Sequence, residues 1–153
     1  MIEPGTPAPE FTLPDQDGTK VSLSDFSGRT VVLVFYPADF SPVCTDQLSV
    51  YQEVLPQFEE RGATLVGISV DGAFCHKAFQ QHLGVTIPLL ADFHPKGEVS
   101  KRYGVWSEEH GLAGRALVVV GPDGKVAWSY MSPMLEVPGA NLIFDALDQL
   151  APA

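Results

Sequence analysis

The sequence predicts an α/β fold in which a central mixed β-sheet is flanked by helices. Residues 31–36 and 63–70 are strand-like runs rich in apolar and β-branched residues, and each precedes a predicted helix. Residues 115–120 and 125–131 are two further runs joined by Pro122-Asp123-Gly124, which predicts a β-hairpin. Because strand–helix units give parallel strands and a hairpin gives antiparallel ones, we expect a mixed sheet.

The N-terminal region predicts a β-hairpin followed by a central strand. Residues 11–13 and 20–23 flank the turn residues Asp17-Gly18, and residues 24–25 begin a short turn. Residues 31–36 form an uninterrupted apolar run, which is typical of a strand buried in the middle of a sheet.

A long helix is predicted over residues 42–61. Pro42 suits a first helical turn, and Gly62 ends the helix. Pro56 lies inside this range and should kink it. One apolar face repeats at helical spacing and is formed by Leu48, Tyr51, Leu55 and Phe58.

The remaining elements complete the pattern. Asp71 is expected to cap a helix that runs to about residue 83, and a short extended piece spans residues 87–92. A helix over residues 95–103 should be capped near His94, and the last helix covers residues 139–150. Strand–helix–strand units followed by a terminal hairpin and helix suit a thioredoxin-like fold. We expect one such domain over residues 1–153.

Composition limits the possible functions. A chain of 153 residues with 45% hydrophobic content fits one domain with a real core. Its apolar runs are far shorter than the roughly 20 residues of a membrane helix, and its start lacks a signal-peptide pattern. The net charge of −10 argues against nucleic-acid and anionic-membrane partners. We therefore expect a cytoplasmic protein.

Cys44 is the residue that most clearly suggests chemistry. It follows the central strand and a Pro/Asp loop, and it lies at the predicted start of a helix. The N–H groups of Val43 and Cys44 and the positive end of the helix dipole favour a thiolate there. A plain buried cysteine is the alternative, because free cysteine is among the most buried residue types.

The spacing Pro37-x-x-x-Ser41-x-x-Cys44 resembles the peroxidatic signature of the peroxiredoxins, the AhpC/TSA superfamily. The resemblance continues through nearly the whole chain, and its length and spacing are most similar to the short AhpE-like one-cysteine enzymes. The further matching segments are Pro7-Ala8-Pro9-Glu10-Phe11-Thr12-Leu13, Ser69-Val70-Asp71, His76-Lys77-Ala78-Phe79, Tyr103-Gly104-Val105, Arg115 and Pro122-Asp123-Gly124-Lys125-Val126.

The resemblance implies a thiol-dependent peroxidase that reduces hydrogen peroxide and organic hydroperoxides. Cys44 would attack the peroxide and become a sulfenic acid, and an external thiol reductant of the thioredoxin, glutaredoxin or low-molecular-weight type would recycle it. It implies neither haem, flavin nor metal as a cofactor. A homodimer is also expected from the resemblance.

The resemblance also assigns site residues. Arg115 opens a predicted central strand, where an unpaired charge would be expensive. It matches the family's active-site arginine, which binds both the thiolate and the peroxide. An exposed arginine at the end of a strand is the alternative. Ser41 would hydrogen-bond the peroxide or simply cap the helix. Pro37 would shield the thiolate, and Gln47 would orient the arginine.

The other polar residues give weaker signals. His76, His82, His94 and His110 have no spacing that builds a metal site, and we expect none. His76 is expected to be a structural hydrogen-bonding residue, and Phe79 to pack behind the site. Trp106 and Trp128 are expected in the core or at an interface.

Two other classes of function stay open. A dithiol oxidoreductase would need Cys-x-x-Cys, which residues 44–47 do not supply. A non-enzymatic binding or holdase protein could use the same fold.

In the proteins that the chain resembles, a resolving cysteine lies either near the C-terminus or five positions after the reactive cysteine. Here no cysteine follows Cys75, and the position five residues after Cys44 is Ser49. The resemblance therefore implies that Cys75 is a buried or interface thiol, with resolution of Cys44 or a Cys75–Cys75 bridge as alternatives.

Overall fold

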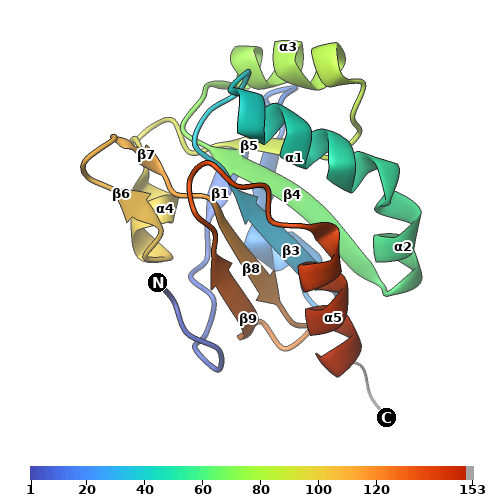
Figure 1. Ribbon diagram of the computed structural model, residues 1–153. Coiled ribbons are helices and arrows are strands. Elements are labelled where there is room, and N and C mark those ends of the chain that lie inside the picture. The colour runs from blue at the N-terminus through green and yellow to red at the C-terminus, as the bar shows by residue number, and fades with distance from the viewer. Residues whose placement is uncertain (151–153) are drawn as a thin grey trace.

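The computed structural model describes residues 1–150, so residues 151–153 of the predicted domain lie outside the described residues. It contains a five-stranded mixed sheet in the order β5-β4-β3-β8-β9, which confirms the predicted fold class (Figure 1). β4 is parallel to β3 and to β5, whereas β8 is antiparallel to β3 and to β9. The strands are β3 (Thr30–Phe35), β4 (Ala63–Ser69), β5 (Leu89–Ala91), β8 (Ala116–Val120) and β9 (Val126–Met131).

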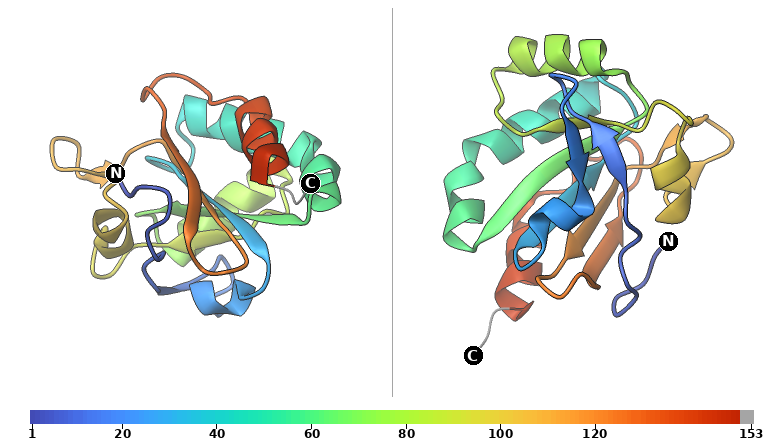
Figure 2. Two further views of the ribbon diagram at one scale, coloured as in Figure 1. Left: turned by 90° about the horizontal axis from the view of Figure 1, so that it is seen from below. Right: turned by 180° about the vertical axis from the view of Figure 1, so that it is seen from behind.

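Each face of the sheet is covered by its own layer (Figure 2). One layer consists of α1 (Pro42–Glu53), α2 (Leu55–Glu60), α3 (Ala73–Leu83) and α5 (Ala140–Leu150). The other consists of the hairpin β1 (Thr12–Pro14) and β2 (Lys20–Ser22), the 3-10 helix η1 (Leu23–Phe26) and α4 (Glu98–Arg102).

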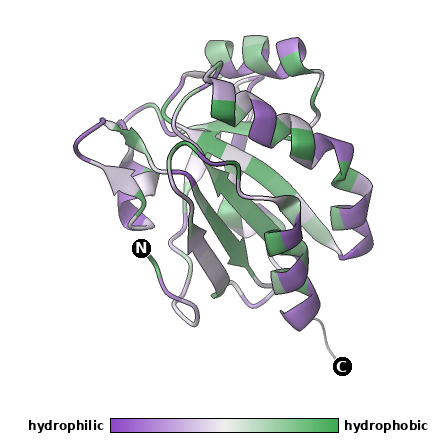
Figure 3. Ribbon diagram, in the orientation of Figure 1, coloured by the Kyte–Doolittle hydropathy of each residue, from purple (hydrophilic) through white to green (hydrophobic). Residues whose placement is uncertain are grey.

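The side chains of β3 supply both cores in alternation, as the period of two along a strand requires. Val32 and Val34 face the α1–α5 layer, whereas Val31, Leu33 and Phe35 face the hairpin layer. The strongly hydrophobic colouring of β3, β4 and β8 shows why an uninterrupted apolar run suits the middle of this sheet (Figure 3). The chain leaves the C-terminal end of this central strand and leads into α1.

The helix predicted over residues 42–61 is interrupted near Pro56, as expected: it is divided at Val54 into α1 and α2, because Pro56 lacks an N–H and clashes with the preceding turn. Two other local expectations, both about how a helix begins, are wrong. Asp71 does not cap α3, whose N-cap is Gly72; the Asp71 carboxylate instead accepts bonds from the Asp39 N–H and the Ser69 hydroxyl.

The helix predicted over residues 95–103 is shorter and is capped differently. α4 begins at Glu98 after Gly97, which adopts a left-handed conformation with φ of 72°. Buried Asp92, rather than His94, accepts the N–H groups of Val99 and Ser100 at 3.1 and 2.9 Å.

Two further features complete the described chain. A small hairpin of β6 (Trp106–Ser107) and β7 (Leu112–Ala113), absent from the expectations, precedes β8. Among the helices of residues 1–150, none has the length and apolar character needed to span a bilayer.

Candidate active site

Cys44 lies in the first turn of α1, where the chain leaves β3. Ser41 is the N-cap by position and Pro42 is the first helical residue. The Ser41 hydroxyl donates to the Ala38 carbonyl at 2.8 Å rather than capping the helix. The Cys44 side chain is fully buried in the core between α1 and the sheet. The sulfur therefore lies at the positive end of a helix dipole and away from bulk water.

Arg115 contacts this sulfur directly. Arg115 immediately precedes β8. The first residue of β8, Ala116, pairs with Phe35, the last residue of β3. This antiparallel register brings Arg115 to the end of β3 that leads into α1. Its Nη1 atom lies 3.2 Å from Cys44 Sγ, and its Nε atom donates to the Met134 carbonyl at 3.0 Å. Only 2% of Arg115 is exposed.

The buried charge of Arg115 lies against the sulfur of Cys44. Among residues 1–150, Arg115 forms no ion pair with a carboxylate. A buried guanidinium without an anion is costly, and an arginine cannot lose its proton in a protein. Cys44 Sγ lies within hydrogen-bond distance of the guanidinium, together with the Met134 carbonyl and the Gln47 amide oxygen, so the arrangement places a permanent cation against the sulfur.

Gln47 lies one turn after Cys44 and is also fully buried. Its Oε1 atom accepts a bond from Arg115 Nη1 at 2.8 Å, and its Nε2 atom donates to the Tyr51 hydroxyl at 3.2 Å. One guanidinium nitrogen therefore contacts both the Gln47 amide and the Cys44 sulfur, which fixes its position.

A pocket of about 180 Å³ opens beside these residues. Of the residues proposed from the sequence, Pro37, Ser41, Val43 and Arg115 line it, and Cys44 lies behind this wall. The rest of the lining consists of Pro42, which adjoins Ser41 in the same segment, and of His110, Leu112, Met134 and Leu135, which come from distant parts of the chain and were not assigned to the site from the sequence. These residues carry no local motif, so only the tertiary fold identifies them.

A buried network holds the loop that precedes Cys44. The Asp39 carboxylate accepts bonds from the Tyr36 hydroxyl at 2.6 Å and from His76 Nδ1 at 2.7 Å. His76 also contacts the Leu90 carbonyl through Nε2 at 3.0 Å, as expected for a structural histidine. Phe79 lies in the same core cluster as Cys44. The loop between β3 and α1 is thus attached to α3 and β5.

Removing the Asp39 carboxylate should destabilise the protein. Asp39→Ala leaves two buried polar groups, on Tyr36 and His76, without their acceptor, and we expect a loss of about 3 kcal/mol in the free energy of unfolding. Urea denaturation would measure it. Asp148→Ala is the control, because its carboxylate pairs with Arg61 at the surface. Equal losses in the two variants would contradict the importance of the network.

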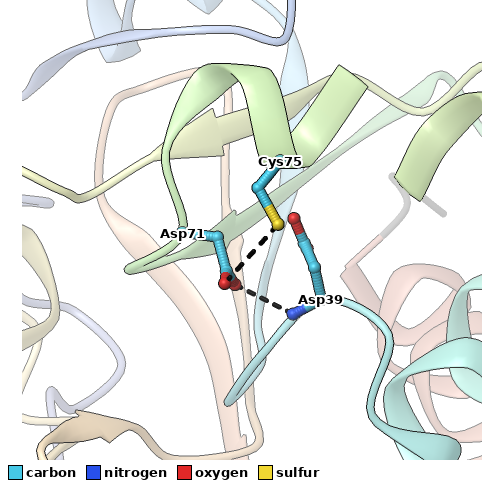
Figure 4. Close-up of side chains that lie close together, drawn as sticks. All are labelled: Asp39, Asp71 and Cys75. Atoms are coloured by element: carbon cyan, nitrogen blue, oxygen red, sulfur yellow. Dashed lines mark hydrogen bonds between the residues drawn. The ribbon is translucent and has the colours of Figure 1, made fainter. Parts of the chain in front are cut away.

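Cys75 lies on α3, a different helix from the one that carries Cys44. Figure 4 shows its side chain extending toward the carboxylates of Asp39 and Asp71. Its Sγ atom donates to an Asp71 oxygen at 4.0 Å, and burial together with the two carboxylates raises the pKa of Cys75 to about 11. The three side chains place potential metal-ligand atoms within 4.8 Å of one another. Hydrogen bonds already account for the positions of both carboxylates.

Comparison with known proteins supports the resemblance seen in the sequence. A profile of the AhpC/TSA family matches residues 4–129. Alkyl hydroperoxide reductase E of Mycobacterium tuberculosis (strain ATCC 25618 / H37Rv) is 38% identical over 151 residues, which cover 98% of this chain and 99% of that protein. The chloroplastic peroxiredoxin Q of Oryza sativa subsp. japonica is 42% identical over 130 residues, or 84% of this chain and 59% of that protein.

The fold comparison agrees with the sequence comparison. The crystal structure of the peroxidoxin BcpB from Mycobacterium tuberculosis superposes with a TM-score of 0.89 at 30% identity, covering 99% of this chain and 100% of that one. Because the family profile covers most of its length and a relative matches it from end to end, the chain belongs to the AhpC/TSA family.

Proposed function

We propose that the protein is a thiol-dependent peroxidase that reduces hydrogen peroxide and organic hydroperoxides through Cys44. The observation that carries the proposal is the buried Arg115 guanidinium 3.2 Å from Cys44 Sγ, at a helix start and beside a pocket. The names of the relatives, alkyl hydroperoxide reductase and peroxiredoxin, point to the same activity.

The reaction needs a sulfur anion and stabilisation of the departing oxygen. The Cys44 thiolate attacks one oxygen of ROOH, the O–O bond breaks, and the other oxygen leaves as ROH after taking a proton. Cys44 then carries a sulfenic acid. A thiol attacks this sulfur and releases water, and a second thiol cleaves the mixed disulfide to restore Cys44.

Each neighbouring residue has a separate role in this proposal. Arg115 donates to the thiolate and to the oxygen that becomes negative, with Gln47 holding it in place. The Ser41 hydroxyl donates its hydrogen bond to the Ala38 carbonyl oxygen, so the Ser41 oxygen remains free to accept a hydrogen bond from the peroxide. Pro37 shields the sulfur, and the first-turn N–H groups of Val43 and Cys44 favour its negative charge.

We propose a one-cysteine cycle because Cys75 is poorly suited to resolve Cys44. A resolving cysteine attacks as the thiolate, and a pKa of about 11 leaves Cys75 protonated at neutral pH. Cys44 is buried in the core, whereas Cys75 lies on a different helix beside two carboxylates. A direct bridge would require the Cα atoms to lie within about 7 Å.

The ionisation of Cys75 can be measured directly. In a Cys44→Ser variant, iodoacetamide should alkylate Cys75 slowly at pH 7, with a rate that rises about tenfold per pH unit until it levels off near pH 11. The rise follows the thiolate fraction, which grows as pH approaches the raised pKa of Cys75. A rate that is already maximal near pH 8 would show that the carboxylates do not suppress its ionisation.

We also propose the reductant, the cellular location and the oligomeric state of the protein. The reductant is an external thiol of the thioredoxin, glutaredoxin or low-molecular-weight type, and the protein acts in the cytoplasm as one domain. A homodimer would cover the exposed side chains of Phe74 and Phe93, which line a pocket of about 380 Å³ beside Cys75.

The test of the activity is stoichiometric. Reduced protein should consume one equivalent of hydrogen peroxide with loss of one thiol. A protein that binds partners without reacting would leave both the peroxide and the thiol count unchanged, which would refute the proposed function.

A further inference from the structure

Tyr51 is a buried residue of α1 that the mechanism above does not use. It lies one turn after Gln47, and its ring packs against Phe58 in the core. Its hydroxyl donates to the Pro138 carbonyl at 2.7 Å and accepts a bond from Gln47 Nε2 at 3.2 Å. It therefore connects the loop after β9 to the residue that holds Arg115.

The hydroxyl proton of Tyr51 is directed at the Pro138 carbonyl oxygen. A carbonyl oxygen only accepts hydrogen bonds, so the hydroxyl must donate its single proton to Pro138. Burial raises the pKa of Tyr51 to about 12, which keeps this proton in place at neutral pH. The phenolic oxygen is then left as an acceptor, and Gln47 must offer it the NH₂ end of its amide.

This constraint and the guanidinium of Arg115 select the same orientation of the Gln47 amide. With Nε2 directed at Tyr51, Oε1 faces the guanidinium, which carries only donors. A rotated amide would place two donors against each other and would leave Arg115 Nη1 without its acceptor. The orientation of a glutamine amide depends on its hydrogen-bond partners, and here the guanidinium on one side and the Tyr51 hydroxyl on the other require the same orientation.

We propose that Tyr51 is a positioning residue of the active site, which fixes the Gln47 amide so that Arg115 remains on the Cys44 sulfur. The inference rests on the proposed peroxidase function. The loop contributes a second connection, because Met134 accepts the bond from Arg115 Nε while Pro138 accepts the bond from Tyr51. Met134 also lines the pocket. The loop after β9 therefore contacts Arg115 through Met134 and Tyr51 through Pro138.

Removing the Tyr51 hydroxyl tests the inference. Tyr51→Phe should lower the second-order rate of Cys44 oxidation by hydrogen peroxide about tenfold, because Gln47 loses the partner that orients it. Tyr103→Phe is the matched control: Tyr103 is also buried and donates to a carbonyl, that of Pro9, but it lies in the core on the opposite face of the sheet. Its rate should stay within twofold of wild type, although both variants lose a buried hydrogen bond.

A second pair of variants separates positioning from stability. Gln47→Glu supplies a carboxylate, whose two oxygens both accept and which needs no orienting partner. Adding Tyr51→Phe to Gln47→Glu should therefore change the rate less than threefold, even though the same core hydroxyl is lost. Urea denaturation of all variants would show that they are folded.

The outcomes distinguish a failure of the Tyr51 role from a failure of the proposed peroxidase function. An active wild type in which Tyr51→Phe matches Tyr103→Phe, or in which Tyr51→Phe costs as much in the Gln47→Glu background as in wild type, would overturn the role of Tyr51 alone. A wild-type protein that consumes no peroxide would overturn both this role and the proposed function.

Discussion

Replacing Cys44 with serine is expected to reduce peroxide consumption to the background rate of the buffer, while the protein keeps its fold. Serine is nearly isosteric with cysteine, so the core between α1 and the sheet stays filled. Its hydroxyl is not ionised at neutral pH and is a weak nucleophile without an adjacent base. The contact between the Arg115 guanidinium and the sulfur would also be lost.

Peroxide consumption by the reduced protein, together with a thermal unfolding curve, measures both parts of this expectation. Cys75→Ser is the matched control, because it removes the other thiol and should leave the rate unchanged. If Cys44→Ser still consumed peroxide at a substantial fraction of the wild-type rate, the reactive sulfur would not be Cys44.

Replacing Arg115 with methionine is expected to slow peroxide reduction about 10²- to 10³-fold, which is the effect of removing one donor that stabilises a transition state. Methionine fills much of the same buried volume, so packing is largely preserved. The Gln47 and Met134 oxygens lose their shared donor, and we expect a moderate loss of stability of about 1–3 kcal/mol.

Stopped-flow measurement of the second-order rate with hydrogen peroxide would test this effect. Arg61→Met is the control, because Arg61 pairs with Asp148 and covers the Phe144 ring at the surface, without a contact to the pocket residues. A rate for Arg115→Met within a few-fold of wild type would exclude Arg115 from the reaction, whatever its distance from the sulfur.

Much of the fold follows from local sequence patterns. The uninterrupted apolar run of β3 predicted a central strand, and the Pro122-Asp123-Gly124 turn predicted the β8–β9 hairpin. The predictions that were wrong concern ends of helices. Asp71 has the chemistry of a cap, but the Asp39 N–H and the Ser69 hydroxyl occupy its carboxylate, and no local pattern reveals that competition.

In the candidate site, too, the residues of one continuous segment could be predicted from the sequence, whereas residues brought in by the tertiary fold could not. The Pro37-to-Cys44 segment is continuous in sequence, so its spacing is visible without a structure. Arg115 and Met134 reach the pocket only because β8 pairs antiparallel with β3 and the loop after β9 returns to it. Tyr51 was predicted only as part of an apolar helical face, because its hydroxyl acquires a partner 87 residues away.

The most direct test of the account is the intact mass of the protein after one equivalent of hydrogen peroxide, with and without a reagent that traps sulfenic acids. We expect a single trapped adduct that peptide mapping places on Cys44, in wild type and in Cys75→Ser alike, with turnover restored by added thiol. A Cys44–Cys75 disulfide that forms before any adduct can be trapped would contradict the one-cysteine cycle, and an adduct on Cys75 alone would contradict the assignment of Cys44 as the reactive sulfur.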